Sequence, residues 1–179
     1  TETNSINNIQ KKSRVLHLGM DLRQFDQYLT NNNGKPLILW NHRWEYDKNP
    51  NDFFKALEQI KNSNYDFELA VLGENFSQNP YIFDEAYQSF TNQIVQWGYA
   101  KSFKDYSQWV WKADILPVTS NQEFFGTSVM EAMYCNTWPI LPNKLTYPEL
   151  IPYGSHQDYL YNSHQDLCDK IMWAIDNIQ

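Results

Sequence analysis

The sequence is poor in cysteine and has no long apolar run. Its 179 residues include only two cysteines, Cys135 and Cys168, with no C-x-x-C pair and no Cys/His spacing that suggests a zinc site. We therefore expect reduced thiols in a cytoplasmic protein. No apolar run approaches the roughly 20 residues needed to span a bilayer, and the polar start TETNSINNIQKKS has no apolar signal core. A soluble protein with no membrane partner is expected.

The sequence is also short of positive charge. It holds 14 Lys and Arg against 21 Asp and Glu, which gives a formal net charge of -7. That balance excludes a large basic face able to bind nucleic acid by itself, although a small basic pocket for an anion can lie within an acidic surface. Any polynucleotide partner must be held mainly elsewhere.

The chain is expected to form one domain that follows a linker. Its apolar content of 42% is enough for a full hydrophobic core. Residues 1–13 are polar and rich in Asn, which predicts a flexible lead-in. The segment VLHLGMDLRQF (15–25) has apolar residues on both sides of Gly19, as a short docking segment does. We expect residues 1–33 to be a linker and docking segment and residues 34–179 to be the folded domain.

Short apolar runs alternate with helical patterns from Pro36 onward. This alternation is typical of a parallel sheet covered by helices on both faces. The sequence therefore predicts an α/β fold, a Rossmann-like doubly wound parallel sheet of about six strands. The strand candidates are PLILWN (36–41), FELAVLG (67–73), IVQWG (94–98), DILPVTS (114–120), WPILP (138–142) and DYLYN (158–162).

Helical patterns lie between and after these strands. The clearest has Asn49 as a candidate N-cap and Pro50 at the first helical position. The last helix is expected to begin at Ser163 and to have one apolar stripe to bury. Residues 80–93 and 106–113 are expected to form two more helices.

Three loops that follow strands are unusually polar. They are NHRWEYDKNP (41–50), GYAKSF (98–103) and SNQEFFGTS (120–128). Ligands of open parallel sheets bind outside the carboxyl ends of the strands. We therefore expect the three loops to converge on one crevice.

The stretch QEFFGTSVMEAM (122–133) predicts an anion site in that crevice. A helix that starts near Gly126 or Thr127 would point unpaired backbone N–H groups and the positive end of its dipole at a ligand. Gly126 would let the ligand approach the backbone, and Thr127 and Ser128 would add hydroxyl donors. Glu131 would lie about one turn inside the helix and Glu123 in the loop before it. A phosphate with a sugar on either side suits this arrangement.

Glu123 and Glu131, followed by Ala-Met and then a strand, resemble the E-x7-E signature of retaining glycosyltransferases built from two Rossmann-like domains (the GT-B fold). Other segments resemble parts of the same enzymes in the expected order and cover almost the whole chain. LWNHRWEYDKNP (39–50) most closely resembles the corresponding loop of the tRNA-queuosine mannosyltransferases within this family. The remaining matches are VLHLGMDLRQF (15–25), similar to the inter-domain segment, and WGYAKSFKDYSQWVWKADILPVTSNQEFFGTSVMEAM (97–133), similar to the donor-site half.

The resemblance implies catalytic roles for Arg43, Lys48 and Glu123. In this family the carboxy-terminal domain binds the sugar nucleotide. Arg43 and Lys48 would neutralise the diphosphate as it leaves, and Glu123 would hold hydroxyls of the donor sugar. Glu131 would hydrogen-bond the ribose hydroxyls.

Further substrate-binding residues follow from the same resemblance. The start of the helix would help to hold the diphosphate, and the GYA segment corresponds to the region that often meets the base. Lys101 is a possible additional contact, and His42 is a candidate pocket residue. The substrate-binding set, besides Glu131, is Gly126, Thr127, Ser128, Gly98, Tyr99, Ala100 and His42.

The resemblance also implies the donor and the acceptor. They would be GDP-mannose and the queuosine of a tRNA anticodon loop. Charge on the leaving oxygen must be met by a metal or by fixed cations and backbone donors. No two aspartates are spaced D-x-D, the pattern of metal-dependent sugar-nucleotide enzymes. We therefore expect no cofactor and no required metal.

An amino-terminal domain that holds the acceptor tRNA is expected to be absent from this chain. We expect the chain to be an excised donor-binding half, able to hold a nucleotide but not to transfer sugar at a useful rate. The alternatives are a nucleotide or nucleotide-sugar binding module without catalysis and a glycosyltransferase with another donor and acceptor. The oligomeric state is open.

Several side chains also allow a purely structural interpretation. Arg43 and Lys48 could pair with Glu45 and Asp47 at the surface, and the two glutamates of the signature could lie on a solvated face. His42 could be a hydrogen-bonded neutral histidine near the sheet edge. Trp44 and Tyr99 could stack on a base or sugar or could pack within the protein. The tryptophans expected to fill the core are Trp40, Trp97, Trp109, Trp111 and Trp173.

The sequence departs from the family pattern at two positions. Phe124 stands where many relatives have Gly, a change that could alter the shape around the sugar. Asn136 replaces the glycine that commonly follows the cysteine. Because Asn tolerates a left-handed backbone, the second change is mild.

Overall fold

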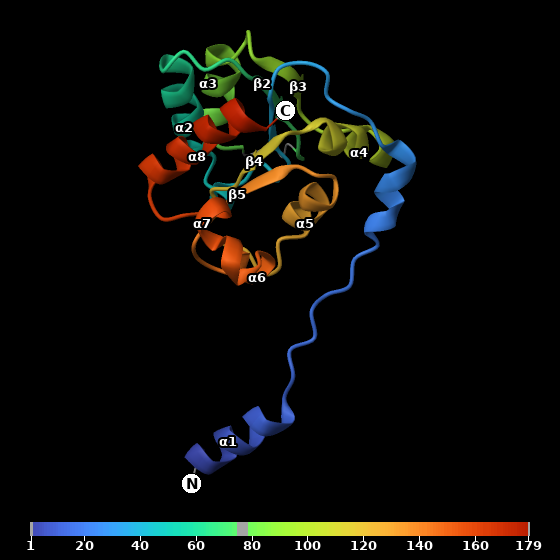
Figure 1. The fold of residues 1–179 in the computed structure, drawn as a ribbon, viewed down its shortest axis with the longest axis vertical. Coiled ribbons are helices and arrows are strands. Elements are labelled where there is room, and N and C mark those ends of the chain that lie inside the picture. The colour runs from blue at the N-terminus through green and yellow to red at the C-terminus, as the bar shows by residue number, and fades with distance from the viewer. Residues whose placement is uncertain (1, 75–78, 179) are drawn as a thin grey trace.

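The structure, a computed structural model, describes residues 2–74 and 79–178 and has a six-stranded parallel sheet at its centre (Figure 1). The strand order is β3-β2-β1-β4-β5-β6, and every neighbouring pair is parallel. The chain thus winds outwards from β1 in both directions, as in doubly wound folds. The predicted fold class is confirmed, and each of the six strand candidates contains a strand. The strands are β1 (Leu37–Trp40), β2 (Glu68–Val71), β3 (Ile94–Trp97), β4 (Ile115–Pro117), β5 (Trp138–Pro142) and β6 (Leu160–Tyr161).

Helices cover both faces of the sheet. Figure 1 shows α2 (Pro50–Asn62), α3 (Ile82–Ser89) and α8 (His164–Asn177) on one side of the strands. On the other side lie α4 (Phe103–Lys112) and α5 (Thr127–Tyr134). The short remaining elements are η1 (Leu22–Tyr28), η2 (Tyr46–Lys48), α6 (Tyr147–Leu150), η3 (Tyr153–Ser155) and α7 (His156–Tyr159).

β1 feeds both hydrophobic cores because successive side chains of a strand point to opposite faces. Ile38 and Trp40 pack into the cluster under α2, α3 and α8, whereas Leu37 and Leu39 pack into the cluster under α4 and α5. All four side chains are buried. A strand that is apolar on both faces is typical of the centre of a parallel sheet.

The predicted helix starts are confirmed at Asn49 and Ser163. Asn49 is the N-cap of α2, although its side chain donates to Asp52 Oδ2 at 2.7 Å and not to a free backbone group. Ser163 Oγ accepts from the backbone N–H of Asp166 at 3.1 Å and so caps α8. α3 is shorter than the expected 80–93, and α4 begins at Phe103 instead of residue 106 because Ser102 caps it.

The first residues of the chain correct one expectation. We expected a flexible lead-in over residues 1–13, but α1 (Glu2–Lys12) is helical and lies apart from the rest of the molecule (Figure 1). The low apolar content of this segment argues against packing on the domain but not against a helix. Ile6 and Ile9 are 55% and 62% exposed. The basic residues in the last turn of α1 complement the helix dipole locally.

The predicted docking segment docks only after Gly19. Leu16 is 95% exposed, and Val15 and Leu18 are also exposed, so the first half of the segment packs on nothing in the described chain. In η1, Phe25 is fully buried, and its ring lies 5.0 Å from that of Phe103 at the start of α4. η1 therefore supports the helix that carries one side of the cavity described below.

The expected burial of the tryptophans holds for most of them. Trp40 is fully buried, and Trp97, Trp109 and Trp111 pack against the two clusters. Trp173 is 50% exposed, which contradicts the expectation, and its ring lies 5.5 Å from that of the partly buried Trp138.

Candidate functional site

One cavity of about 610 Å³ lies at the carboxyl ends of the strands. It is lined by residues from the three polar loops and from the start of α5, so the predicted convergence of these loops is observed. The segment after β2, which the sequence did not single out, adds a fourth wall. The lining residues are Asn41, His42, Arg43, Lys48, Leu72, Gly73, Glu74, Tyr99, Ala100, Lys101, Ser102, Phe103, Tyr106, Glu123, Thr127, Ser128 and Glu131.

Gly98 and Gly126 are the two residues of the expected site that do not line the cavity. Gly98 has φ 98°, and its N–H donates to Val71 O at 2.8 Å, so it forms the turn that leaves β3. Gly126 has φ 88° and is the N-cap of α5. A Cβ at this position would lie 3.1 Å from Leu150 Cδ1. Both glycines therefore shape the backbone of the loops that form the cavity.

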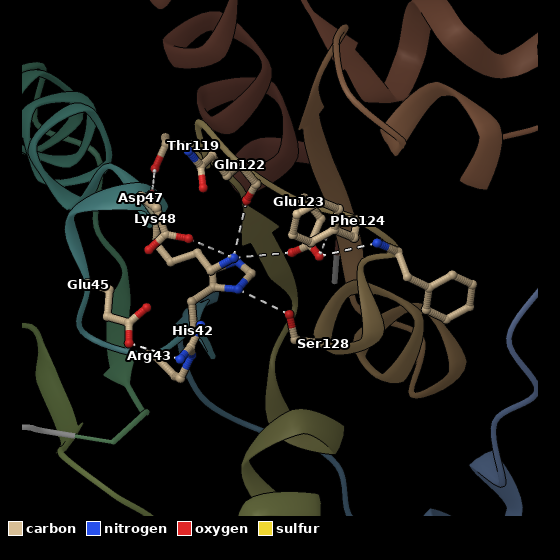
Figure 2. Close-up of polar contacts among 11 residues, drawn as sticks. His42, Arg43, Glu45, Asp47, Lys48, Thr119, Gln122, Glu123, Phe124 and Ser128 are labelled. Carbon is tan, nitrogen blue, oxygen red and sulfur yellow. Dashed lines mark hydrogen bonds and ion pairs between the residues drawn. The ribbon is translucent and has the colours of Figure 1, made fainter.

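Asn41 and His42 tie the loop after β1 to the first turn of α5. Asn41 Nδ2 donates to the carbonyl of Ser128 at 2.9 Å. The Ser128 hydroxyl lies 3.1 Å from His42 Nδ1 (Figure 2). Ser128, expected to donate to an anion, therefore already has partners within the protein. Thr127 is exposed at the same edge of the cavity.

His42 is a buried neutral histidine that also lines the cavity. The residue is only 4% exposed and belongs to the cavity lining. Burial, reinforced by the charge of Lys48 and opposed by Glu123 and Asp47, lowers the pKa of His42 to about 4. His42 is thus uncharged near neutral pH and does not act as a cation. The structure thus agrees with a hydrogen-bonded neutral histidine, and a role of His42 in ligand binding stays a prediction.

Lys48 and Glu123 form a pair within the cavity wall. The Lys48 ammonium, on a side chain only 11% exposed, lies 3.3 Å from Glu123 Oε2 and 3.4 Å from Asp47 Oδ2 (Figure 2). It also donates to Gln122 O at 3.3 Å. The pairing with Asp47 that was considered from the sequence is present, but it joins a buried Lys48 to a half-buried Asp47 and does not lie fully at the surface.

Glu123 is held as a carboxylate. Oε1 accepts from the backbone N–H groups of Phe124 at 2.9 Å and Phe125 at 3.3 Å. Burial pushes the pKa of Glu123 up, but the charge of Lys48 and these backbone donors outweigh it, so the pKa lies below its ordinary value. Phe124 itself is 95% exposed, and Figure 2 shows its ring directed away from the Lys48 cluster.

Arg43 lies at the rim of the cavity. Its side chain is 57% exposed, and Nη1 lies 2.9 Å from Glu45 Oε1. The surface pairing considered from the sequence is therefore present. An exposed pair of this kind contributes only about 0.2 to 1 kcal/mol. An anionic ligand can displace Glu45 from Arg43 at little energetic cost.

Glu131 receives a hydrogen bond from Tyr106, a residue that the sequence analysis placed in a helix without a functional role. The Tyr106 hydroxyl donates to Glu131 Oε2 at 2.5 Å. Burial raises the pKa of Glu131, and the hydrogen bond from Tyr106 opposes that rise. The only sequence signal for Tyr106 is its place in the first turn of a helix directly after a ligand-facing loop.

The two aromatic residues considered for stacking differ in their environments. Trp44 is 4% exposed, stacks on Phe83 with ring centroids 4.3 Å apart, and donates from Nε1 to Leu72 O at 2.9 Å. Trp44 therefore packs within the protein. Tyr99 is 66% exposed and lines the cavity.

Three further features concern the described part of the chain. Within residues 2–74 and 79–178, no three His, Cys, Asp or Glu side chains form a group that could hold a metal ion. Among the helices of these residues, none has the length and apolar character needed to cross a bilayer. Cys135 and Cys168 are buried free thiols.

Comparison with known proteins gives consistent matches. Residues 23–178 match the family model described as glycosyl transferases group 1. The chain is 30% identical over 172 residues to the tRNA-queuosine alpha-mannosyltransferase of Drosophila melanogaster, covering 91% of the chain and 44% of that protein. The chain thus spans less than half the length of this curated relative.

Solved structures show the same fold at low sequence identity. The C-terminal domain of a glycosyl transferase group 1 family protein (LpcC) from Francisella tularensis has a TM-score of 0.64 and 21% identity, over 91% of this chain and 86% of that one. HepE of Anabaena in complex with UDP has a TM-score of 0.69 and 19% identity, over 92% of this chain and 48% of that one. At these identities the likeness concerns the fold.

Proposed function

The chain belongs to the group 1 glycosyl transferases, and from this premise we propose that it is the donor-binding domain of a retaining enzyme that transfers mannose from GDP-mannose to queuosine in tRNA. The observation that carries the proposal is the single cavity in which Arg43, Lys48, Glu123, Glu131 and the start of α5 meet. The name of the Drosophila relative supports mannose and queuosine. The UDP complex of HepE supports a nucleotide sugar as the ligand class.

The cationic side of the cavity suits a diphosphate. Arg43 at the rim and Lys48 in the wall supply two positive charges, and the backbone N–H groups of the first turn of α5 add donors and a dipole. Negative charge that develops on the leaving oxygen would be stabilised by these preorganised groups. We propose that they meet this charge without a required metal or cofactor.

The carboxylates suit hydroxyl groups on either side of the diphosphate. Among the hydrogen bonds of the described residues, the Glu131 carboxylate accepts at Oε2 only, which leaves Oε1 for a ribose hydroxyl. Glu123 is ionised and fixed by Lys48 and two backbone donors. Since a carboxylate oxygen can accept more than one hydrogen bond, Glu123 can still bind hydroxyls of the donor sugar.

The base would lie near the segment after β3. Tyr99 and Ala100 line the cavity there, and the exposed ring of Tyr99 is available for stacking. Lys101 lines the same wall. The acceptor tRNA would contact mainly parts of the enzyme outside this chain, because the formal net charge of -7 is unsuited to binding a polyanion. A cytoplasmic location, which we propose as well, is compatible with a tRNA-modifying role.

A second candidate function is a nucleotide or nucleotide-sugar binding module without catalysis. The observation that favours it is the coverage of only 44% of the Drosophila relative, since the whole activity of that protein need not reside in the matched part. A third candidate is a glycosyltransferase with another donor and acceptor, which would use the same cavity. The nucleotide that the cavity prefers distinguishes it from the first proposal.

Calorimetric titration with GDP, UDP and GDP-mannose tests the proposal. We expect GDP and GDP-mannose to bind and UDP to bind more weakly. Glu131→Gln and Arg43→Ala are each expected to weaken GDP binding by about tenfold, the effect of one lost charge-assisted hydrogen bond. Lys35→Ala is the matched control, because Lys35 is an exposed cation paired with Asp66 and does not line the cavity. Failure of all three nucleotides to bind would contradict the proposal.

Mannose transfer to queuosine-containing tRNA separates the enzyme from the binding module. The assay compares the chain alone with a version extended by any sequence encoded upstream of Thr1. The enzyme proposal expects the extended version to transfer mannose and to lose that activity in Glu123→Gln. Tight GDP binding without transfer by either version would favour the module.

A further inference from the structure

Tyr106 occupies an unusual place for a tyrosine hydroxyl. It lies in the first turn of α4, and its ring packs edge-on against Phe25 with centroids 6.1 Å apart. Tyr106 lines the cavity, and its hydroxyl donates to Glu131 Oε2 at 2.5 Å. The ring is thus fixed from behind by η1, while the hydroxyl contacts an ionisable side chain of α5.

Asn41 orients the Tyr106 hydroxyl. Its Nδ2 lies 3.5 Å from Tyr106 Oη and 2.9 Å from the Ser128 carbonyl. Because an amide nitrogen can only donate, the Tyr106 oxygen accepts from Asn41 and its own hydrogen is directed to Glu131. A short chain of donors therefore runs from the end of β1 through α4 to the carboxylate on α5.

We propose that Tyr106 is a positioning residue for Glu131: its hydroxyl occupies one carboxylate oxygen and so aims the other at the hydroxyl-bearing part of the ligand. This inference rests on the proposed function of the cavity as a nucleotide site. A carboxylate with two free oxygens can rotate and must be ordered when the ligand binds, whereas one held by Tyr106 is ordered beforehand.

Tyr106 remains a donor across the working range of pH. Burial, followed by the adjacent Glu131 charge, raises the pKa of Tyr106 well above its ordinary value, so the hydroxyl stays protonated. Because Tyr106 opposes the effect of burial on Glu131, removing its hydroxyl will raise the pKa of Glu131 further. The other titratable groups that line the cavity with Glu131 and Tyr106, together with the C-cap of α5, are His42, Arg43, Lys48, Glu74, Tyr99, Lys101, Glu123 and Cys135.

The test is GDP titration by calorimetry from pH 5 to pH 8 on the whole chain and on Tyr106→Phe. We expect about tenfold weaker binding by Tyr106→Phe at pH 7, as for the loss of one hydrogen bond to a charged group. We also expect its affinity to decline at a higher pH than that of the unchanged protein as the solution is acidified. Glu131→Gln is expected to lack the part of this decline that comes from Glu131 and to keep only the part that comes from titration of the GDP phosphate, which all variants share.

Tyr161→Phe is the matched control. Its hydroxyl is also part-buried and donates to Val118 O at 2.9 Å, but Tyr161 does not line the cavity. The GDP affinity of Tyr161→Phe, and the dependence of that affinity on pH, should match those of the unchanged protein. If Tyr106→Phe binds GDP with unchanged affinity and an unchanged pH profile, the positioning role is wrong while the nucleotide site stands. If the unchanged protein binds no nucleotide, the proposed function fails first.

Discussion

Lys48, Glu123 and His42 show how the charge states of the cavity depend on one another. Lys48 keeps Glu123 ionised, and its charge helps to keep His42 neutral. The ammonium and the carboxylate belong to residues 75 positions apart in the chain. Their pairing could not be derived from the sequence, because it depends on how η2 and the loop after β4 are brought together by the fold. The sequence predicted which residues share the cavity, but not which of them form ion pairs and hydrogen bonds with one another.

Tyr106 was missed for a related reason. A tyrosine in the first turn of an amphipathic helix is ordinarily interpreted as a core aromatic, and its ring does pack against Phe25. Only the direction of the hydroxyl, set by the angle between α4 and α5, reveals the contact with Glu131. By contrast, the positions of Arg43 and Glu131 at one cavity follow from the rule that strand-end loops of a parallel sheet converge.

The buried His42 predicts a pH dependence of stability. Its folded-state pKa of about 4 lies below the ordinary value of 6.5, so between these values the unfolded chain binds a proton that the folded chain does not. The contribution of neutral His42 to the unfolding free energy is fully present above pH 6.5. As the pH falls towards 4, the unfolding free energy decreases by up to about 3 kcal/mol. His42→Gln should therefore show a flatter dependence of the unfolding free energy over this range.

Urea denaturation at pH 7, 6, 5 and 4.5 measures this dependence. The control is His17→Gln, because His17 is exposed and makes no contact with the cavity wall. We expect its pH dependence to match that of the unchanged protein. If the unfolding free energy changes with pH equally in the unchanged protein and in His42→Gln, His42 is not held neutral in the folded state.

At the scale of elements, the sheet could be predicted well and the chain start could not. β1, β2, β4 and β5 are short apolar runs bounded by polar loops, and this local pattern alone identifies them. α1 lies apart from the rest of the described chain (Figure 1), so a hydrophobic pattern gives no signal for it. Asn136 has a left-handed backbone with φ 64°, a conformation that Asn tolerates better than most residues with a side chain.

The start of α5 depends on the backbone of Gly126. With φ 88° and a Cβ position only 3.1 Å from Leu150 Cδ1, Gly126→Ala introduces strain of about 1 to 2 kcal/mol from the left-handed conformation alone. We expect Gly126→Ala to lower the unfolding free energy by at least that amount and to weaken GDP binding, because the first turn of α5 moves. Denaturation and calorimetric titration measure the two effects.

Gly154→Ala is the matched control for this change. Gly154 lies in η3, is exposed, and a Cβ there would meet nothing within 4 Å. The substitution should change stability by less than about 0.5 kcal/mol and leave GDP binding unchanged. Should Gly126→Ala prove as stable as Gly154→Ala, the left-handed cap would not be required for the position of α5.

At the scale of the whole molecule, the cavity depends on both hydrophobic cores. The loop after β1 follows a strand that packs into both of them, whereas α4 and α5 rest on the core that includes Phe25. η1 closes that second core from outside the sheet. Phe25 of the expected docking segment thus packs into a core of the domain expected over residues 34–179, and we expect the stability of that domain to depend on it.

Two truncated chains locate the start of the folded unit. A chain of residues 21–179 should unfold at the same urea concentration as the whole chain, because Val15, Leu16 and Leu18 are exposed and α1 packs on nothing described. A chain of residues 34–179 loses Phe25 and should be destabilised by about 3 to 5 kcal/mol, the cost of removing a buried phenylalanine. Phe25→Ala in the whole chain should reproduce most of that loss. If residues 34–179 are as stable as the whole chain, η1 does not stabilise the fold. In that case α4, and with it Tyr106, would be held in place by the sheet alone.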